Sequence, residues 1–342
     1  MRYVVVRAHG LKTHLLDKET YTKLSRARNL EEIVSALSGT EYSEEISKVP
    51  VRELSARILG RIFRRILSNR FFGITKIAWI SGEISLTELF SNYSKRFEVE
   101  NIKMILRAKH GKTKINEDVL IPIPREYLMI NFPALIGAKD VQEVVSMLRE
   151  TIYRGLLDYL DVYGETGSVA VLEAVLDKIY YENVWESIHK TKIDIKDVKE
   201  IVGLEIDLKN LYTVVSLKKI DLAPELIEKV LIKYYFRIKL DELKEVARGP
   251  IERIAEIIRR LPYVELGSKI PKLLKEENYS LFEDLILKIL FRKAGDIMKA
   301  CPDTLGYVFG YLILCEREYR NLIRIVEAIE LGIGEKISER IL

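Results

Sequence analysis

Two acids and an asparagine form the most chemically capable pattern in this sequence, with spacings of two and three residues. The pattern occurs as Glu205, Asp207 and Asn210 and again, 111 residues later, as Glu316, Glu318 and Asn321. Carboxylate and amide groups can bind a ligand or take part in catalysis. On a helix, however, positions five residues apart point about 140° away from each other. The three side chains therefore fit a helix wedged between neighbours better than one shared binding site.

A third, divergent copy lies nearer the N-terminus, where Glu98 and Asn101 stand in register and Arg96 replaces the first acid. A buried carboxylate or asparagine is costly unless its hydrogen bonds are satisfied. Repetition of such a costly feature indicates a recurring junction between helices, which fixes how parts of the chain join. A binding or catalytic role for these eight acids and asparagines is the alternative.

The densest cationic run is made of Arg57, Arg61, Arg64 and Arg65, followed by Arg70. The run could be a solvated face with ion pairs to neighbouring acids, or a surface for an acidic partner or anionic lipid headgroups. RNA is a third possible ligand, but no aromatic residues are interleaved for base stacking. The four arginines are therefore candidates for contact with a partner or a membrane.

Other reactive side chains form no recognisable site. Cys301 and Cys315 lack a disulfide or zinc pattern, and the four histidines lack metal-ligand spacing. Asp158 and Asp161 fit a solvated acidic face, and no phosphate-binding loop ending in Gly-Lys-Ser or Gly-Lys-Thr is present. We therefore expect no catalytic residue, no cofactor and no metal site, and a chain that is not an enzyme.

The elements that must position these residues are helices. Between Val51 and Arg70, apolar residues recur at spacings of three and four, which is the pattern of an amphipathic helix. The segments 172–188 and 281–298 show the same period, whereas the alternation typical of strands is nearly absent. Hydrophobic residues make up 48% of the 342 residues, which is enough to bury a core. The sequence thus predicts an all-α fold, with two or three domains for this length.

The overall composition excludes several classes of protein. With 55 basic and 51 acidic residues, the net charge is +4, which by itself does not indicate nucleic-acid binding. The longest apolar stretch, at 304–315, is shorter than the roughly 20 residues of a membrane span, and the N-terminus does not read as a signal peptide. Two cysteines suit a reducing cytoplasm. The single glutamine, Gln142, beside abundant charged residues suggests a thermophilic source.

Further internal similarity suggests three related units. Segment 173–180 matches 283–290, and segment 141–149 matches 251–259, each pair being 110 residues apart. Segment 30–37 resembles the second of these elements, whereas the C-terminal copy stops before reaching it. We therefore expect three similar helical lobes in a closed, cupped arrangement. Their expected extents are residues 1–50 together with 305–342, residues 51–165 and residues 166–304.

The same residues resemble a known family, the C subunits of archaeal-type rotary ATPases, to which the d subunits of vacuolar ATPases also belong. The resemblance lies in Glu205–Leu211 and in its C-terminal counterpart Glu318–Leu322, where Tyr319 replaces the family's isoleucine. The N-terminal region is also similar, at Tyr3, Arg7, Ala8, Leu15, Leu16, Tyr21, Leu24 and the turn Gly39–Tyr42. No single motif is highly specific; the order of several weak ones along the whole chain is the signal.

The resemblance implies an all-helical, funnel-shaped protein with three lobes related by pseudo-threefold symmetry. Such a protein lies peripherally on the cytoplasmic face of the membrane, in one copy per complex, on the rotor ring of proteolipid subunits. Its central depression receives the D and F subunits of the central stalk, so that it couples ATP chemistry to ion transport without binding nucleotide or nucleic acid.

A different class of function competes with this one. A helical-repeat scaffold that binds RNA or a protein partner outside bioenergetics would also be rich in amphipathic helices. Open solenoids, however, stack repeats of about 20–50 residues. A period of about 110 residues that is completed across the two termini is not typical of them, so the rotary ATPase component is the preferred hypothesis.

Overall fold

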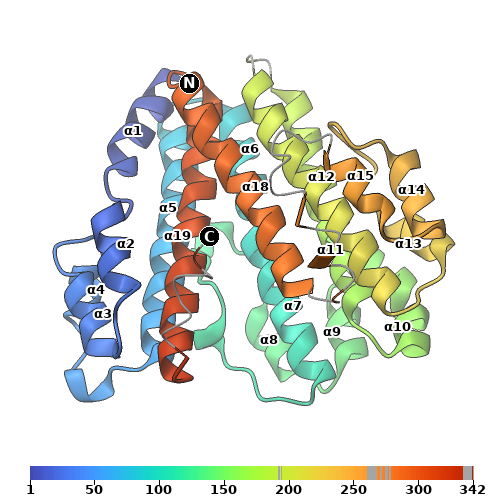
Figure 1. The fold of residues 1–342 in the computed structure, drawn as a ribbon, viewed down its shortest axis with the longest axis horizontal. Coiled ribbons are helices and arrows are strands. Elements are labelled where there is room, and N and C mark those ends of the chain that lie inside the picture. Colours follow the sequence, from blue (N-terminus) through green and yellow to red (C-terminus); the bar gives the residue numbers. More distant parts are fainter. Residues whose placement is uncertain are drawn as a thin grey trace.

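The computed structural model describes residues 1–191, 193, 195–259 and 279–333, together with residues 268, 269, 272, 273, 276 and 341. Within these ranges the regular elements are helices and no strand occurs, which confirms the predicted all-α fold. No helix among these residues is long and apolar enough to cross a membrane. Figure 1 shows the arrangement of the helices.

Long helices form the frame of the molecule, and short helices from the N-terminal segment and from the connections pack around them. The first half of the chain contains α1 (Arg2–Lys12), α2 (Lys18–Leu24), α3 (Leu30–Ala36), α4 (Tyr42–Ile46), α5 (Ala56–Ile80), α6 (Ile84–Ser94), α7 (Arg96–His110), α8 (Phe132–Gly137), α9 (Val141–Met147) and α10 (Leu160–Thr166). The second half contains α11 (Ala170–Lys190), α12 (Lys196–Lys219), α13 (Pro224–Val230), α14 (Leu240–Arg248), α15 (Arg253–Arg259), α18 (Tyr279–Ala300) and α19 (Leu305–Glu330). Short 3-10 helices are η1 (Val51–Glu53), η2 (Glu117–Val119), η3 (Arg125–Tyr127) and η4 (Ile152–Tyr159).

Helix α5 illustrates why these segments are helical. It begins after Ser55, whose hydroxyl accepts a hydrogen bond from the Ile58 amide and so satisfies one free N–H of the first turn. Its predicted apolar stripe is buried, including Leu59, Phe63 and Ile66. Helices α5, α19, α18 and α12 pack side by side in that order, and α5 and α19 extend over most of the height of the molecule (Figure 1).

The N-terminal segment packs against α19. A separate hydrophobic core joins residues of α2 to α5 with the C-terminal half of α19, and Leu37 and Tyr42 meet Leu322, Ile325 and Val326 there. Figure 1 shows the short N-terminal helices beside α5 and α19. The N-terminal segment and α19 are therefore in contact, whereas the division into three lobes stays a prediction.

Two distant segments share a capping arrangement. The Asn29 side chain accepts from the Glu32 amide, and the Glu32 carboxylate accepts from the amide of residue 28. The same two bonds recur 111 residues later, with Asp140 and Glu143 in place of the first pair. The arrangement is similar to a capping box, but the glutamate accepts from the amide of the residue before the N-cap. The similarity between segments 30–37 and 141–149 is thus also a similarity of local structure.

The next turn repeats as well. The Thr40 hydroxyl donates to a carbonyl of the preceding turn and accepts from the Tyr42 amide. The hydroxyl of Thr151 makes the same pair of bonds, and there the amide belongs to Tyr153. Both tyrosines are buried. Each therefore reaches inward from an equivalent turn toward a carboxylate, as described below.

Candidate functional site

The first positions of the three motif copies meet at one point, although they stand on three different helices. Arg96 on α7 donates to Glu205 on α12, with Nη2 and Oε1 2.9 Å apart. It also donates to Glu316 on α19, with Nη1 and Oε2 2.6 Å apart. One guanidinium therefore binds two carboxylates that come from equivalent places in the repeat.

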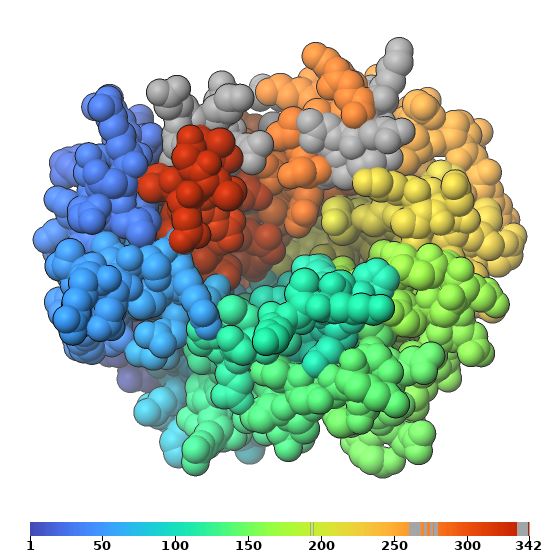
Figure 2. Space-filling view, turned by 90° about the horizontal axis from the view of Figure 1, so that it is seen from below, coloured from blue at the N-terminus to red at the C-terminus, as the bar shows by residue number. Residues whose placement is uncertain are grey.

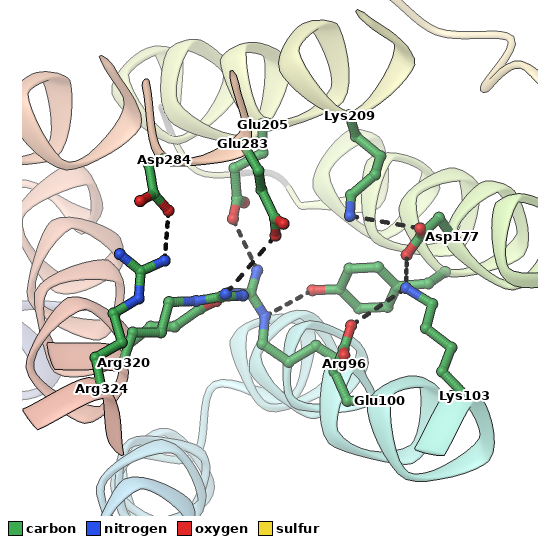
Figure 3. A network of polar contacts seen from close by, with 12 residues as sticks. Arg96, Glu100, Lys103, Asp177, Glu205, Lys209, Glu283, Asp284, Arg320 and Arg324 are labelled. Atoms are coloured by element: carbon green, nitrogen blue, oxygen red, sulfur yellow. Dashed lines mark hydrogen bonds and ion pairs between the residues drawn. The ribbon is translucent and has the colours of Figure 1, made fainter. Parts of the chain in front are cut away.

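Aromatic side chains complete this junction. The Arg96 Nε donates to the Tyr180 hydroxyl at 3.1 Å, and the guanidinium carbon lies 4.0 Å from the centre of the Tyr93 ring. The Tyr93 hydroxyl in turn donates to Glu205 at 3.1 Å. A buried ion pair is stable only when its remaining hydrogen-bonding groups are satisfied. These contacts meet that condition (Figure 3).

The two acids of the junction have different electrostatic surroundings. Burial raises the pKa of Glu205 above its ordinary value, although Arg96 acts in the opposite direction. Burial also opposes the ionisation of Glu316, but Arg320 and Arg96 outweigh it and lower its pKa. Arg320 binds Glu316 at 2.9 Å, one turn away on the same helix. Of the two acids, Glu205 therefore depends more heavily on Arg96.

The acids at the second positions of the first two copies bind backbone amides of segments about 30 residues further along the chain. Asp207 accepts hydrogen bonds from three consecutive backbone amides, those of Phe236, Arg237 and Ile238. Burial raises its pKa to about 6, although the three N–H groups partly offset this effect. The carboxylate of Glu98 accepts instead from the Met129 amide and, at 2.9 Å, from a tyrosine hydroxyl. That hydroxyl belongs to Tyr153 in the repeated turn.

Glu318 occupies the corresponding position on α19 and binds the N-terminal segment. It accepts from the Tyr42 hydroxyl at 2.7 Å and from the Leu16 amide. Arg70 on α5 donates to it at 2.8 Å and also binds Glu41. The C-terminal helix thus contacts the N-terminal turn through a tyrosine–carboxylate bond like that between Tyr153 and α7.

The third positions hold loops through paired backbone bonds. Asn101 donates to the Ile121 carbonyl and accepts from the Ile121 amide, both at 2.8 Å. Asn210 makes the same pair of bonds with Ile232, at 3.1 and 2.9 Å. Asn321 is equally buried. In each case the amide side chain satisfies both the N–H and the C=O of one buried residue, as the backbone of a neighbouring strand would.

The predicted arginine run lies along α5. Arg57 binds Asp118 at 2.6 Å, and Arg65 binds Glu45 at 2.8 Å. Arg64 donates to the backbone carbonyl of Asp118, whereas Arg61 is exposed and forms no ion pair with a described residue. Exposed pairs of this kind contribute about 0–1 kcal/mol. Three of the four arginines thus have neighbours within the chain.

A central hollow opens beside the Arg96 junction. It has a volume of about 390 Å³ and lies between α7, α11, α12, α18 and α19. Its lining includes Arg96, Glu205 and Glu316 of the junction, together with Met104 and Glu327. Figure 2, which looks at the lower end of the molecule, shows the surface hollowed at the centre.

Charges of both signs line the wall of the hollow and pair across helices. Lys103 on α7 binds Asp177 on α11 at 2.6 Å, and Lys209 on α12 binds the same carboxylate at 3.4 Å. On the other side, Arg324 on α19 binds Asp284 on α18. The wall therefore combines apolar side chains with charged ones, and ion pairs between neighbouring helices hold the charged ones in place (Figure 3).

The comparison with known proteins decides the family. The profile of the ATP synthase (C/AC39) subunit family matches residues 4–340. The chain belongs to this family. It is 26% identical over 341 residues to the C subunit of the A-type ATP synthase of Methanosarcina mazei, with 98% of this chain and 90% of the relative covered. The corresponding C subunit of Methanocaldococcus jannaschii is 25% identical over 330 residues, covering 95% and 82% respectively. The resemblance seen in the sequence is thus confirmed.

In this C/AC39 chain the motif residues lie at contacts between segments and do not surround one ligand. Glu205 and Glu316 come together, whereas five other motif residues each bind a separate turn or loop, namely Glu98, Asn101, Asp207, Asn210 and Glu318. Sequence reasoning noted Arg96 only as a departure from the motif and gave Arg70 no role in it. The signal for Arg96 was its opposite charge at a position that is acidic in both other copies. That the motif fixes the joining of three lobes stays a prediction.

Proposed function

We propose that the chain is a non-catalytic adaptor subunit of an A/V-type rotary ATPase or ATP synthase. In this role it joins the central stalk to the proteolipid rotor ring and passes torque between them during ion transport. Family membership supports the proposal, as do the similar proteins, which are named as C subunits of A-type ATP synthases. The protein would contribute shape and contacts, while ATP chemistry takes place on other subunits.

The observation that carries the proposal is the central hollow. It is open at the lower end of the molecule, has the Arg96 junction in its lining, and is walled by long helices. Its lining combines apolar side chains such as Met104 and Tyr212 with paired charges of both signs. A helical end from the D and F subunits of the central stalk would find both apolar surface and polar partners there.

Torque transmission requires helices that resist moving against one another. Arg96 links α7, α12 and α19 through charge-assisted hydrogen bonds, which are among the stronger kinds in proteins. Asn101 and Asn210 hold two loops by their backbones, so that loops also move with the helices. A load applied inside the hollow would therefore spread to the whole helical frame.

The position of the hollow also suggests an orientation. The hollow is visible from the lower end of the molecule (Figure 2), and Arg324 and Glu327 in its lining lie near the end of α19, to which α5 runs in the opposite direction (Figure 1). The end of the molecule at which α5 finishes is therefore remote from the mouth. With the stalk in the hollow, that remote end would face the proteolipid ring on the cytoplasmic side of the membrane, in one peripheral copy per complex.

A matched pair of methionine substitutions tests stalk binding. Met104 lines the hollow, whereas Met147 is 44% exposed at the end of α9 and outside its lining. We expect the full chain to bind a purified complex of the D and F stalk proteins. Met104→Glu should weaken this binding at least tenfold, and Met147→Glu should leave it unchanged. Binding is measured by calorimetry, with melting temperatures showing that both variants fold.

Two results would overturn the proposal. One is failure of the wild-type chain to bind the D and F complex, together with recovery of RNA or an unrelated protein from native cells. Such recovery would favour the helical-repeat scaffold. The other is equal loss of binding in both methionine variants, which would place the contact outside the hollow. Retention of the chain on membranes together with the ATPase head supports the adaptor role.

A further inference from the structure

The turn between α5 and α6 carries three large apolar side chains that are open to solvent. Trp79 is 68% exposed, Ile80 56% and Ile84 83%. They lie within six residues, around a tight turn in which Gly82 has a φ of 75°. That backbone conformation favours glycine. The three side chains therefore form one projecting apolar tip, which is called here the α5–α6 tip.

The tip is held rigidly by the elements behind it. Ala78 at the end of α5 and Leu86 at the start of α6 are fully buried in the main core. The N-terminal ammonium of Met1 binds Glu83 at 3.2 Å and ties α1 to the turn. Exposed apolar side chains on a rigid support do not arise from a loose loop. Their exposure on a well-packed helical hairpin indicates a surface that a membrane or another molecule covers.

The charges beside the tip are mainly cationic. Arg2 on α1 and Lys76 on α5 are exposed, and neither forms an ion pair with a described residue. The nearby acid Glu83 already binds the N-terminal ammonium, and Glu88 lies 3.6 Å from Lys190. The net charge that the described residues leave beside the tip is therefore positive, which is complementary to an anionic surface.

The outward face of α1 extends the apolar character. Tyr3 is 47% exposed and Val6 66% exposed, whereas Val4 and Val5 are buried against the core. Tryptophan and tyrosine at the apolar–polar boundary, with lysine and arginine nearby, form the pattern of side chains that lie in a membrane interface. Cationic groups close to an anionic bilayer add attraction to the apolar insertion.

We propose that the α5–α6 tip inserts Trp79, Ile80 and Ile84 into the interfacial layer of an anionic lipid bilayer. This inference rests on the proposed function for its orientation, because the tip stands at the end remote from the hollow. The convex form of the tip suits a fluid bilayer, which closes around projecting side chains. The cations Arg2 and Lys76 select anionic headgroups over a neutral surface.

Vesicle flotation tests the proposal with the full chain. The vesicles are pure phosphatidylcholine or equal parts phosphatidylcholine and phosphatidylglycerol. We expect binding to the anionic vesicles and little to the neutral ones. The double variant Trp79→Ser, Ile84→Ser should partition about tenfold less. The control is Val51→Ser, because Val51 is 76% exposed but precedes the opposite end of α5.

A second readout follows the depth of the tip. The chain has two tryptophans. In a Trp185→Phe background, Trp79 reports its own surroundings, and its emission should shift to the blue on binding anionic vesicles. Lys76→Glu should weaken binding in low salt more than in high salt, since salt screens the charge term.

The outcomes separate this inference from the proposed function. Absence of wild-type binding to anionic vesicles overturns the lipid inference, as does equal loss in the Val51→Ser control. Tip variants that fail only on a delipidated proteolipid ring would also overturn it, in favour of a protein contact. A chain that binds vesicles through the tip but not the stalk complex would support the lipid inference and refute the stalk-binding role.

Discussion

The Arg96 junction offers the sharpest test of how the helical frame is held together. Arg96→Met keeps much of the aliphatic length of the side chain but removes the guanidinium that Glu205 and Glu316 share. Glu316 retains Arg320 at 2.9 Å. Glu205 retains only its bond with the Tyr93 hydroxyl among these partners, and its side chain is 3% exposed. The damage should therefore concentrate at Glu205.

The expected magnitude follows from the burial of the pair. Removing one member of a buried ion pair typically costs about 3–5 kcal/mol, because the remaining charge stays buried without a partner. For a chain of this size the melting temperature should fall by roughly 10 °C. Thermal and urea unfolding followed by far-UV circular dichroism measure both quantities. A loss below about 1 kcal/mol would show that water or a rearranged side chain replaces the guanidinium.

The loss should also depend on pH, with a definite sign. Burial already raises the pKa of Glu205 with Arg96 present, and removing the cation raises it further. An acid with a raised folded-state pKa is least costly below its unfolded pKa of about 4.3, and the cost grows as pH rises through the folded pKa. The difference in stability between wild type and Arg96→Met should therefore shrink on acidification from about pH 8 to about pH 5. A difference that grows on acidification would refute this assignment.

A charge exchange tests whether the three repeat positions really meet. Arg96→Glu places three carboxylates together and should destabilise the fold more than Arg96→Met. Adding Glu205→Arg restores one cation and two acids at the same point and should recover a large part of the loss. Positions in contact give non-additive effects, whereas distant ones add. Simple additivity of the two substitutions would refute the shared junction.

Three further outcomes are expected. Asn210→Ala leaves two buried backbone groups unsatisfied, so urea unfolding should show a loss of about 2–4 kcal/mol, and a loss under about 0.5 kcal/mol would contradict the paired bonds. Gly306→Ala places a Cβ 2.5 Å from that of Asp197 and should lower the free energy of unfolding by about 1–3 kcal/mol. The control is Gly295→Ala, whose Cβ meets nothing within 4 Å and which should be neutral or stabilising. Melting temperatures compare the two variants. Burial raises the pKa of Cys315 to about 12, so a thiol reagent should label it only in denaturant, and rapid labelling of two thiols in the native chain would contradict its burial.

The helices could be predicted from sequence because their information is local. Stripes such as Leu59, Phe63 and Ile66 fix which face of α5 is buried, whatever packs against it. The wedged position of the motif helix could be inferred for a similar reason. Side chains five residues apart on one helix diverge, and Glu205 and Asn210 do bind groups on different sides.

The partners of those side chains could not be predicted in the same way. Arg96 meets acids 109 and 220 residues away, and nothing in its own segment encodes how closely α12 and α19 approach. Arg70 likewise binds Glu318, 248 residues away, although the sequence shows only one more arginine on α5. Helical period specifies a buried face, whereas ion pairing depends on the relative placement of whole helices.

The contact between the N-terminal segment and α19 has a consequence for biosynthesis. Leu16 and Tyr42 leave the ribosome long before their partner Glu318, which is made 302 and 276 residues later. Until α19 emerges, the apolar side chains of the N-terminal segment lack the surface that covers them. Closure of this region must therefore await the synthesis of α19, and nascent chains would be open to aggregation or chaperone binding until then.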